Sequence, residues 1–414
     1  MTTLTDALPK VSLHDEIMGL EREYLLQNYG RYPVVLHRGK GAYLWDTGGK
    51  KYLDFISGIG VNALGHNHPR VTKIIRDQAA KLIHTSNLYY HEFQGRLAKK
   101  LAETSGLQRS FFCNSGTEAT EGAMKMLRAH GTAISPDKFE IIALENSFHG
   151  RTLGALSITG QHKYRKPFGP LLPGVRFVEN NDLDALEGVF NENTCGILVE
   201  GIQGEGGIYP VSREFVQRSR ELCDKYDALY VADEIQCGVG RPGAYYSYQL
   251  FHPVIMPDIM IAAKPLGCGL PLGCIVANER AAASIAPGMH GSTFGGNALA
   301  CRVALEFFDI LEDLMPKVVA TGDYFRARLT DLKTKFPFIR EVRGSGLMIG
   351  VELDGPGKQV VLDCMNDGLL LNCTHDTVLR FLPPYIIGER EVNQAIKVLT
   401  KALKNFTPTP VEAH

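Results

Sequence analysis

Short apolar runs alternate along the chain with longer stretches of helical periodicity. Such runs predict buried strands at 141–144, 196–199, 229–232, 259–262 and 273–276. Residues 111–113 predict a further short strand, and a helical stretch follows it through Arg128. Strands that alternate with helices favour an α/β domain with a mostly parallel sheet.

The same pattern divides the chain into three parts. Residues 1–69 are expected to form an N-terminal segment that packs on the other two parts. Residues 70–314 would form the large α/β domain, which closes with a long helix over 298–314. We expect Pro316 to end this helix, because proline lacks the N–H that a helix interior needs. Residues 315–414 would then form a smaller α+β domain.

Lys264 stands directly after an apolar run, with Pro265 next in the chain. Burial lowers the pKa of an amine toward neutrality, and a neutral lysine can condense with a carbonyl as a Schiff base. A lysine that snorkels from a strand end is the commoner explanation of one such residue. Two further features of the chain favour the chemical reading.

The first feature is the acidic pair Asp233 and Glu234, which follows the strand at 229–232. Ligands of open α/β sheets bind at this carboxyl edge, although a simple ion pair with Lys264 is an alternative. The second feature is a helix start at 114–118, where Ser115 can cap the helix and Glu118 can reach back. Gly116 would admit a ligand to free N–H groups that favour phosphate, although capping alone also explains these residues.

A phosphate site, a carboxylate and a condensing lysine together suit one cofactor, pyridoxal 5′-phosphate (PLP). The carboxylate would keep the ring nitrogen protonated. A protonated ring withdraws electrons from a substrate carbon that loses a proton, which is the chemistry PLP brings to amino acids.

At these residues the chain resembles the class III aminotransferases of PLP-dependent transferase fold type I, and among them the acetylornithine aminotransferases. The resemblance covers nearly the whole chain and rests on 39–46, 61–66, 114–118, 148–152, 203–207, 233–238, Lys264 and 290–297. It implies an α/β fold, with a large domain around a mostly parallel sheet and a smaller C-terminal α+β domain.

The resemblance also implies roles in cofactor binding. Lys264 would be the catalytic residue, holding PLP covalently and then moving the substrate proton. Asp233 would pair with the ring nitrogen, and Phe148 would stack on the ring. Thr293 would reach the phosphate of a neighbouring subunit, which implies a homodimer with shared active sites. The implied cofactor-binding residues are Gly116, Thr117, Phe148, Asp233, Glu234, Ile235, Gln236, Lys264 and Thr293.

Substrate binding is implied to need two carboxylate sites, for which a planar guanidinium is suited. Arg380 would bind 2-oxoglutarate or glutamate, and Glu205 would pair with Arg380 while the amine donor is bound. Arg151 and Ser292 would hold the carboxylate of that donor. A surface salt bridge would explain either arginine equally well without the motif.

The implied reaction moves the terminal amine of N2-acetyl-L-ornithine to 2-oxoglutarate, giving N-acetyl-L-glutamate 5-semialdehyde and L-glutamate, in arginine biosynthesis. Ornithine, succinylornithine, acetyl-lysine and 4-aminobutyrate are alternative donors. A PLP enzyme that does not transaminate, or a non-enzymatic PLP-fold binding protein, is a more remote alternative.

Three residues depart from the pattern of the class III aminotransferases that the chain resembles. Gly201 stands where the family usually has proline, and we expect it to loosen the loop that carries Glu205. Cys237 replaces a threonine or serine. Gly122 is expected to weaken its helix by about 1 kcal/mol relative to alanine.

Composition narrows the class of protein. With 44% hydrophobic residues the chain can form a large core. Its net charge of −1 gives no electrostatic preference for nucleic acid or anionic lipid. Residues 1–10 lack an apolar signal core and no membrane span is evident, so we expect a cytoplasmic protein. Nine cysteines without a C-x-x-C pair indicate reduced thiols.

Two other motifs have alternative readings. Residues 238–243 satisfy the dinucleotide pattern G-x-G-x-x-G, but Pro242 and the aromatic run after it fit poorly with a helix start. His66 and His68 could suggest a metal site, yet no carboxylate or cysteine stands at ligand spacing. We therefore expect a loop at 66–68 and no metal.

Overall fold

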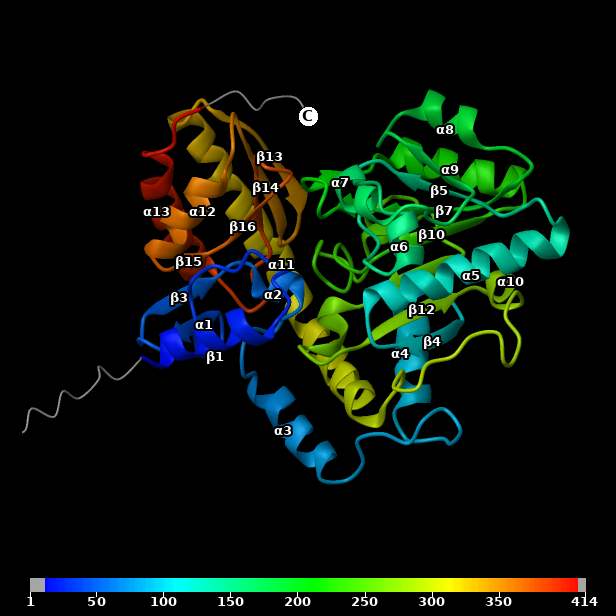
Figure 1. The fold of residues 1–414 in the computed structure, drawn as a ribbon, viewed down its shortest axis with the longest axis horizontal. Coiled ribbons are helices and arrows are strands. Elements are labelled where there is room, and N and C mark those ends of the chain that lie inside the picture. Colours follow the sequence, from blue (N-terminus) through cyan, green and yellow to red (C-terminus); the bar gives the residue numbers. More distant parts are fainter. Residues whose placement is uncertain (1–11, 409–414) are drawn as a thin grey trace, which may run out of the picture.

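A seven-stranded sheet forms the centre of the larger lobe of the molecule, in the computed structural model that describes residues 12–408 (Figure 1). Its strand order is β4-β12-β11-β10-β7-β5-β6. Only β12 runs antiparallel to its neighbours, so the predicted, mostly parallel sheet is confirmed. The strands are β4 (Arg109–Cys113), β5 (Glu140–Leu144), β6 (Val175–Val178), β7 (Thr194–Glu200), β10 (Leu229–Asp233), β11 (Ile259–Ala262) and β12 (Gly273–Ala277).

All six predicted strands are present because they are apolar on both faces. Every residue of β7, β10, β11 and β12 is buried, as expected where helices cover a sheet on two sides. The edge strand β6 was not predicted. It has four residues and exposes Arg176, so its sequence carries no continuous apolar run.

Helices cover the two faces of this sheet with separate apolar clusters. The helix α5 (Gly116–Ile134) packs on one face, against Ile141, Leu198 and Ile275. On the other face, α8 (Leu183–Val189) and α9 (Arg213–Lys225) pack on Ile142 and Ile197. The helix α4 (Gln94–Ser105) covers the same face nearer β12.

The smaller lobe is built on a four-stranded antiparallel sheet of order β13-β14-β17-β16. Its strands are β13 (Ile339–Ser345), β14 (Met348–Leu353), β16 (Asn372–Thr374) and β17 (Val378–Phe381). The helices α12 (Lys358–Asn366) and α13 (Glu389–Leu403) belong to this lobe (Figure 1). It has the α+β composition that the sequence predicted.

The N-terminal segment joins the small lobe and touches the large one. It contains α1 (Leu13–Tyr24), β1 (Leu36–Lys40), β2 (Tyr43–Asp46) and β3 (Lys51–Asp54), and β3 pairs with β15 (Leu369–Leu370). Gly60 accepts a hydrogen bond from Arg241, on the loop after β10. Residues 12–69 therefore contact both lobes, while residues 1–11 of the predicted segment lie outside the described part.

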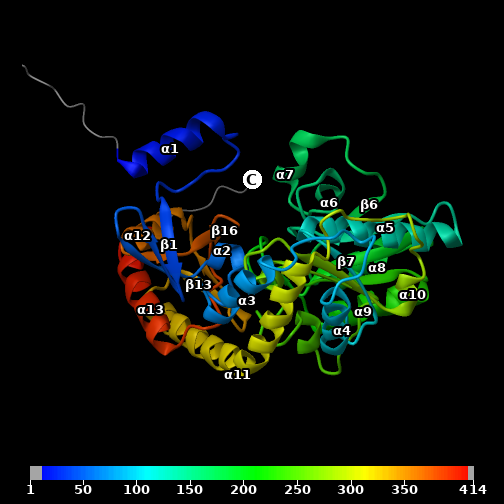
Figure 2. The same ribbon diagram turned by 90° about the horizontal axis from the view of Figure 1, so that it is seen from below.

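One long helix, α11 (Ala298–Lys335), connects the two lobes (Figure 2). The prediction that Pro316 ends this helix was wrong, because Pro316 lies within it on an exposed face. Buried residues on either side of the proline, including Leu311 and Val318, keep the helix packed although one hydrogen bond is lost. The predicted boundary between 314 and 315 falls inside α11, so the domain limits stay a prediction.

Shorter elements complete the described chain. They are α2 (Ser57–Gly60), α3 (Pro69–Ala79), α6 (Leu153–Ser157), α7 (His162–Arg165), α10 (Glu279–Ala282), the 3-10 helices η1 (Lys166–Phe168), η2 (Ser247–Leu250) and η3 (Lys264–Gly267), and strands β8 (Ile202–Gln203) and β9 (Tyr209–Pro210). All nine cysteines are free. No helix in residues 12–408 has the length and apolarity needed to cross a membrane.

Glycines let α5 lie close to the sheet. A Cβ on Gly122 would lie 2.4 Å from Ile275 Cδ1, and one on Gly131 would lie 2.1 Å from the carbonyl oxygen of Lys138. Gly122 lowers the helix propensity of α5, but it allows the helix to lie close to the strand that carries Ile275. Ordinary side chains at these positions would push the helix away from the sheet.

We expect Gly131→Ala to lower the free energy of unfolding by about 1–3 kcal/mol, because the added methyl meets backbone that cannot move aside. Gly95→Ala in α4 is the matched control, since nothing lies within 4 Å of its Cβ position. That control should gain up to about 1 kcal/mol from helix propensity. Urea unfolding measures both, and a gain in Gly131→Ala would contradict the packing argument.

Candidate active site

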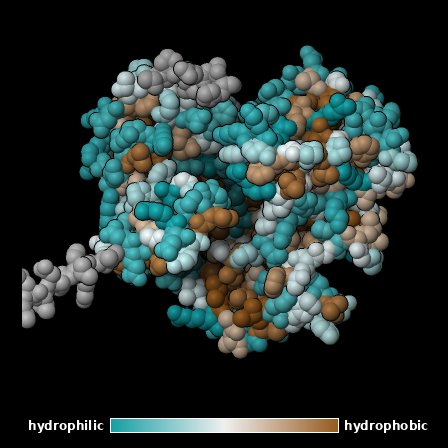
Figure 3. Space-filling view, viewed as in Figure 1, coloured by the Kyte–Doolittle hydropathy of each residue, from teal (hydrophilic) through white to brown (hydrophobic). Residues whose placement is uncertain are grey.

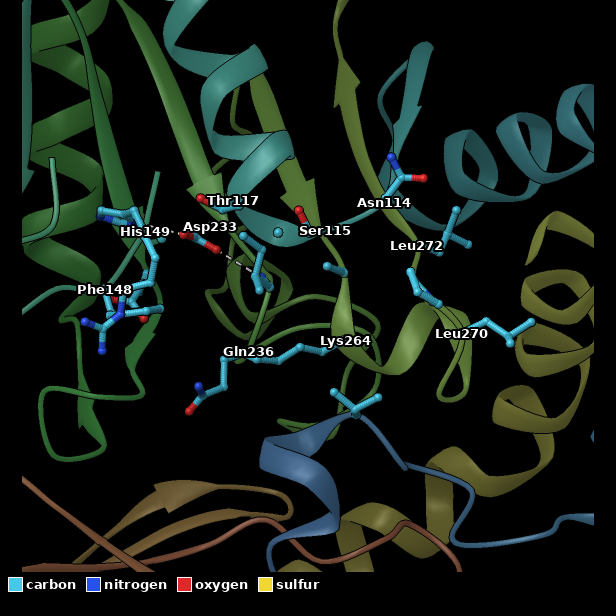
Figure 4. Close-up of a pocket in the computed structure, with 18 of the residues that line it drawn as sticks. Asn114, Ser115, Thr117, Phe148, His149, Asp233, Gln236, Lys264, Leu270 and Leu272 are labelled. Atoms are coloured by element: carbon cyan, nitrogen blue, oxygen red, sulfur yellow. Dashed lines mark hydrogen bonds and ion pairs between the residues drawn. The ribbon is translucent and has the colours of Figure 1, made fainter. Parts of the chain in front are cut away.

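A cavity of about 440 Å³ opens at the carboxyl edge of the large sheet (Figure 4). The N-terminus of α5, the ends of β7 and β10, and the start of η3 all face it. Most predicted site residues meet here. Those lining the cavity are Gly116, Thr117, Phe148, Arg151, Asp233, Ile235, Gln236 and Lys264.

Lys264 begins η3 in a left-handed backbone conformation, with φ of 46°. This conformation is uncommon for a residue with a side chain and tends to occur at functional sites. Lys264 is partly buried, and this burial lowers its pKa, although Glu205 and Asp233 oppose the shift. Its side chain forms no hydrogen bond or ion pair with any residue of 12–408, so its amine is available to a ligand.

Asp233 ends β10 and is fixed by two contacts. His149 Nδ1 lies 2.7 Å from its Oδ2, and the Ile235 N–H donates to its Oδ1 over 3.0 Å (Figure 4). Burial lowers the pKa of His149, but the hydrogen bond and charge of Asp233, with the charge of Glu200, raise it overall. The raised pKa of His149 thus reflects its contact with the Asp233 carboxyl group inside the protein.

Glu200 lies opposite Asp233 in the pairing of β7 with β10. Burial raises its pKa to about 7, although the charge of His149 opposes this. Its carboxylate accepts from the backbone N–H groups of Phe148, at 3.0 Å, and Gly204, at 3.3 Å. Glu200 thus connects the loop before α6 to the loop that carries Glu205.

His149 and Glu200 are site residues to which the sequence reasoning gave no role. A signal existed for Glu200, because it ends an apolar strand at the same sheet edge as Asp233. His149 belongs to the segment 148–152, on which the family resemblance partly rests, but its contact with Asp233 joins residues 84 apart in the chain. Only the fold brings that pair together.

The start of α5 has the predicted Ser115 cap, but Glu118 reaches back to the N–H of Asn114 and not to that of Ser115, so the capping box is incomplete. Ser115 Oγ accepts from the Glu118 N–H at 3.3 Å, and Glu118 Oε2 accepts from the Asn114 N–H at 2.5 Å. No atom of residues 12–408 accepts from the N–H groups of Gly116 or Thr117. These two groups and the helix dipole can bind an anion at the cavity wall.

Arg380 in β17 is buried and lies behind Gln236. Its Nη1 donates to Glu205 Oε1 at 2.5 Å and to Gln236 Oε1 at 3.0 Å. Gln236 Nε2 also donates to Glu205 Oε1, at 3.3 Å. Burial alone would raise the pKa of Glu205, but Arg380 more than offsets it and lowers that pKa. The predicted Glu205–Arg380 pair therefore exists next to the cavity.

Arg151 lies at the exposed mouth of the cavity, against two aromatic rings. Its guanidinium is 3.9 Å from the ring centroid of Tyr164 and 5.4 Å from that of Phe148. The two rings meet edge to face at 6.2 Å. Stacking on aromatic faces restrains an arginine while leaving its N–H edges free for a carboxylate.

Besides the Glu205–Arg380 pair, three predicted residues, Ser292, Thr293 and Glu234, do not line this cavity. Ser292 and Thr293 line a neighbouring cavity of about 310 Å³, and Asn114 belongs to both. Asn114 Nδ2 donates to Ser292 Oγ at 3.2 Å, so Ser292 approaches the first cavity through Asn114. The carboxylate of Glu234 instead accepts from the N–H and hydroxyl of Ser247, and burial raises its pKa to about 7.

The two departures at Gly201 and Cys237 lie at one packing position. A Cβ on Gly201 would lie 2.2 Å from Ser247 Oγ, and Cys237 Sγ lies 3.5 Å from the same atom. The loop with Glu205 is held by Glu200 and by Thr374, whose hydroxyl donates to the Glu205 carbonyl oxygen at 2.6 Å. The effect of Gly201 on the stiffness of this loop stays a prediction.

The alternative motifs do not form ligand sites. Residues 238–243 make a turn with Gly240 and Gly243 at positive φ, and no helix begins there. His66 Nε2 instead lies 2.8 Å from Asp54 Oδ2, in the N-terminal segment. Within residues 12–408 no group of three histidines, cysteines or acids could hold a metal ion.

Comparison with known proteins agrees with this geometry. The model of the family described as aminotransferase class-III matches residues 24–403. The chain belongs to the class III aminotransferases. A curated relative, the acetylornithine aminotransferase of Methanocaldococcus jannaschii, is 48% identical over 92% of this chain and 96% of its own.

Two solved structures of class III aminotransferases resemble the fold. The ornithine aminotransferase of Toxoplasma gondii has a TM-score of 0.90 and 34% identity, over 95% of this chain and 96% of its own. The acetylornithine aminotransferase of Elizabethkingia anophelis has a TM-score of 0.84 and 33% identity, over 96% of this chain and all of its own. The fold is therefore that of PLP-dependent aminotransferases, as predicted.

Class III aminotransferases use PLP, and the cavity residues fit it. The Lys264 side chain has no partner in the described chain, the N–H groups of Gly116 and Thr117 are free, and Asp233 is held in place by His149. These groups would meet the aldehyde, the phosphate and the ring nitrogen, respectively. When bound, PLP supplies an electron sink for charge that develops on a substrate carbon.

Borohydride reduction tests the assignment of Lys264. We expect reduction of the protein purified with PLP to attach the cofactor to one tryptic peptide, the one with residue 264, because a neutral amine condenses with an aldehyde. Lys264→Ala should bind PLP without a covalent link and lose turnover almost completely. Peptide mass spectrometry measures the attachment, and exposed Lys225→Ala is the control. A label on another lysine would contradict the assignment.

Proposed function

We propose that this aminotransferase moves the terminal amine of N2-acetyl-L-ornithine to 2-oxoglutarate in arginine biosynthesis. The products are N-acetyl-L-glutamate 5-semialdehyde and L-glutamate. The observation that carries the proposal is the Glu205–Arg380 pair next to Lys264. The curated relatives' name, acetylornithine aminotransferase, supports the choice of amine donor.

The ion pair suits an enzyme that accepts two different substrates in turn. Paired with Glu205, Arg380 presents no free charge, which favours a donor whose amine end enters this side of the cavity. Freed from Glu205, the same guanidinium can bind a carboxylate of 2-oxoglutarate through two hydrogen bonds. An enzyme with a single substrate gains nothing from such an exchange.

The remaining residues would bind and orient the reactants. Lys264, whose pKa burial lowers, would take a proton from the substrate carbon and return it. Asp233, supported by His149, would hold the proton on the ring nitrogen. Arg151 would bind the donor's carboxylate from the cavity mouth, with Ser292 reached through Asn114.

We also propose that the protein works as a homodimer, because Thr293 lies on an exposed segment outside the cavity that contains Lys264. Large apolar residues are exposed on neighbouring segments, among them Leu88 at 84% and Phe294 at 62%. Asn87 Nδ2 donates to the Gly295 carbonyl oxygen at 3.0 Å, which joins these segments. Apolar residues gather on the face that Figure 3 shows, over the start of α11 and the chain after α3. A second subunit would cover them.

A cytoplasmic location is part of the proposal. Nine free cysteines suit a reducing compartment, where thiols persist.

The amine donor can be identified from a single half-reaction. We expect N-acetylornithine alone to convert the PLP form of the protein to the pyridoxamine form, followed by absorbance. We also expect its kcat/KM to exceed those of ornithine, succinylornithine, acetyl-lysine and 4-aminobutyrate by about tenfold or more, because differences in side-chain binding of about 1.4 kcal/mol have this effect. Preference for 4-aminobutyrate would refute the acetylornithine assignment, and no half-reaction would refute transamination.

Arg380→Ala should separate the two substrates. Loss of one member of a buried charge pair costs about 2–5 kcal/mol, so kcat/KM for 2-oxoglutarate should fall about 30-fold or more. The half-reaction with the amine donor should change much less. Arg340→Ala removes an exposed arginine of the same lobe and is the matched control. Equal losses for both substrates would contradict the assigned role of Arg380.

A further inference from the structure

Arg241 is a fully buried arginine outside the cavity, and its surroundings differ from those of Arg380. Its Nη1 donates to the carbonyl oxygens of Leu347, at 3.1 Å, and Pro383. Its Nη2 donates to the carbonyl oxygen of Gly60 at 3.4 Å. It has no ion pair with any residue of 12–408. Burial of a cation without a carboxylate partner destabilises the folded protein, so a functional role would explain why Arg241 lies here.

These carbonyl groups belong to the strands that carry the substrate arginine. Leu347 immediately precedes β14, and Pro383 lies two residues after β17. The two strands are antiparallel, with Gly350 opposite Arg380. The guanidinium of Arg241 therefore holds together the adjacent ends of the two strands that place Arg380.

Arg241 itself lies on the loop that carries the cofactor-facing residues. It is eight positions after Asp233 and five after Gln236 in the sequence. Its own carbonyl oxygen accepts from the Leu347 N–H at 2.9 Å. The contacts of one residue thus fix the small lobe against the loop of the large lobe that ends β10.

The contact to Gly60 adds a third segment. Residues 57–60 all have positive φ, and Ile59 at 60° is a β-branched residue in a strained conformation. Val61, the next residue, lines the cavity. Ser57 Oγ donates to the Leu382 carbonyl oxygen at 2.5 Å, so the strained turn also packs on the chain after β17.

We propose that Arg241 is a positioning residue that sets the distance between Arg380 and Gln236, and so controls the affinity for the dicarboxylate substrate. This inference rests on the proposed role of Arg380. Arg241 touches neither substrate nor cofactor, and acts through Pro383 and Leu347. Small displacements of a substrate-binding group are enough to reduce catalysis strongly.

The test compares full-length holoenzymes with glutarate as the probe, a five-carbon dicarboxylate without a reactive carbonyl. The variants are Arg241→Met, Arg241→Lys, Arg380→Ala and the control Lys138→Met. Lys138 is also a buried cation bonded only to carbonyl oxygens, those of Glu192 and Tyr226, but it lies just before β5 at the opposite edge of the sheet. Glutarate affinity, melting temperature and the half-reaction rate with the best amine donor are measured for each.

We expect both methionine variants to melt at lower temperature. The deciding quantity is the ratio of the fold-loss in glutarate affinity to the fold-loss in the amine half-reaction rate. This ratio should be at least about five in Arg241→Met and should stay near one in Lys138→Met. Arg241→Lys, which keeps the charge and some of the hydrogen bonds, should recover part of the affinity. If Arg241→Met does not fold, the same ratio measured for Arg241→Lys tests the positioning role.

A smaller ratio, or equal losses in both measurements, overturns the positioning role and leaves Arg241 as a purely structural residue. The result for Arg380→Ala is independent of this outcome. Unchanged glutarate affinity in that variant would refute the proposed role of Arg380 itself.

Discussion

The active site depends on the mutual compensation of charged groups that are removed from water. Asp233 and Arg380 are buried, and each is stabilised by an ionisable neighbour, His149 and Glu205 respectively. An unpaired charge in this environment would be strongly destabilising, whereas a partner of opposite charge offsets much of that cost. The lowered pKa of Lys264 results from the same burial. A change at any one group therefore alters the electrostatic surroundings of the others.

The parallel sheet makes this concentration of charge possible. Strands β7 and β10 end side by side, which places Glu200 next to Asp233, and the chain after β11 delivers Lys264 to the same edge. Backbone N–H groups of Gly204 and Phe148 bind Glu200, so the acid is held without a second cation. The groups that need exact placement stand on or beside rigid elements, while Arg380 is supplied by the other lobe.

Much of this arrangement was predictable because it depends on local sequence. The central strands are apolar on both faces, and the residues that end them, Asp233 and Lys264, interrupt apolar runs with charge. Features set by tertiary contacts were not predictable. Pro316 remains in a helix because buried residues before and after it pack on both lobes. Likewise, the pairing of His149 with Asp233 cannot be inferred from two distant segments.

The two fully buried arginines show how similar residues can serve opposite purposes. Arg380 donates to three side chains, Glu205, Gln236 and Asn372, and to one backbone carbonyl oxygen, that of Gly204. Its charged partner, the Glu205 carboxylate, can rotate away and be replaced by a substrate carboxylate. The partners of Arg241 are backbone carbonyl groups, which can leave only if the strands move. An exchangeable arginine binds selectively only if its strand is fixed, since otherwise the strand would move when Glu205 departs. On this argument the carbonyl-bound guanidinium of Arg241 is a condition for the exchange at Arg380.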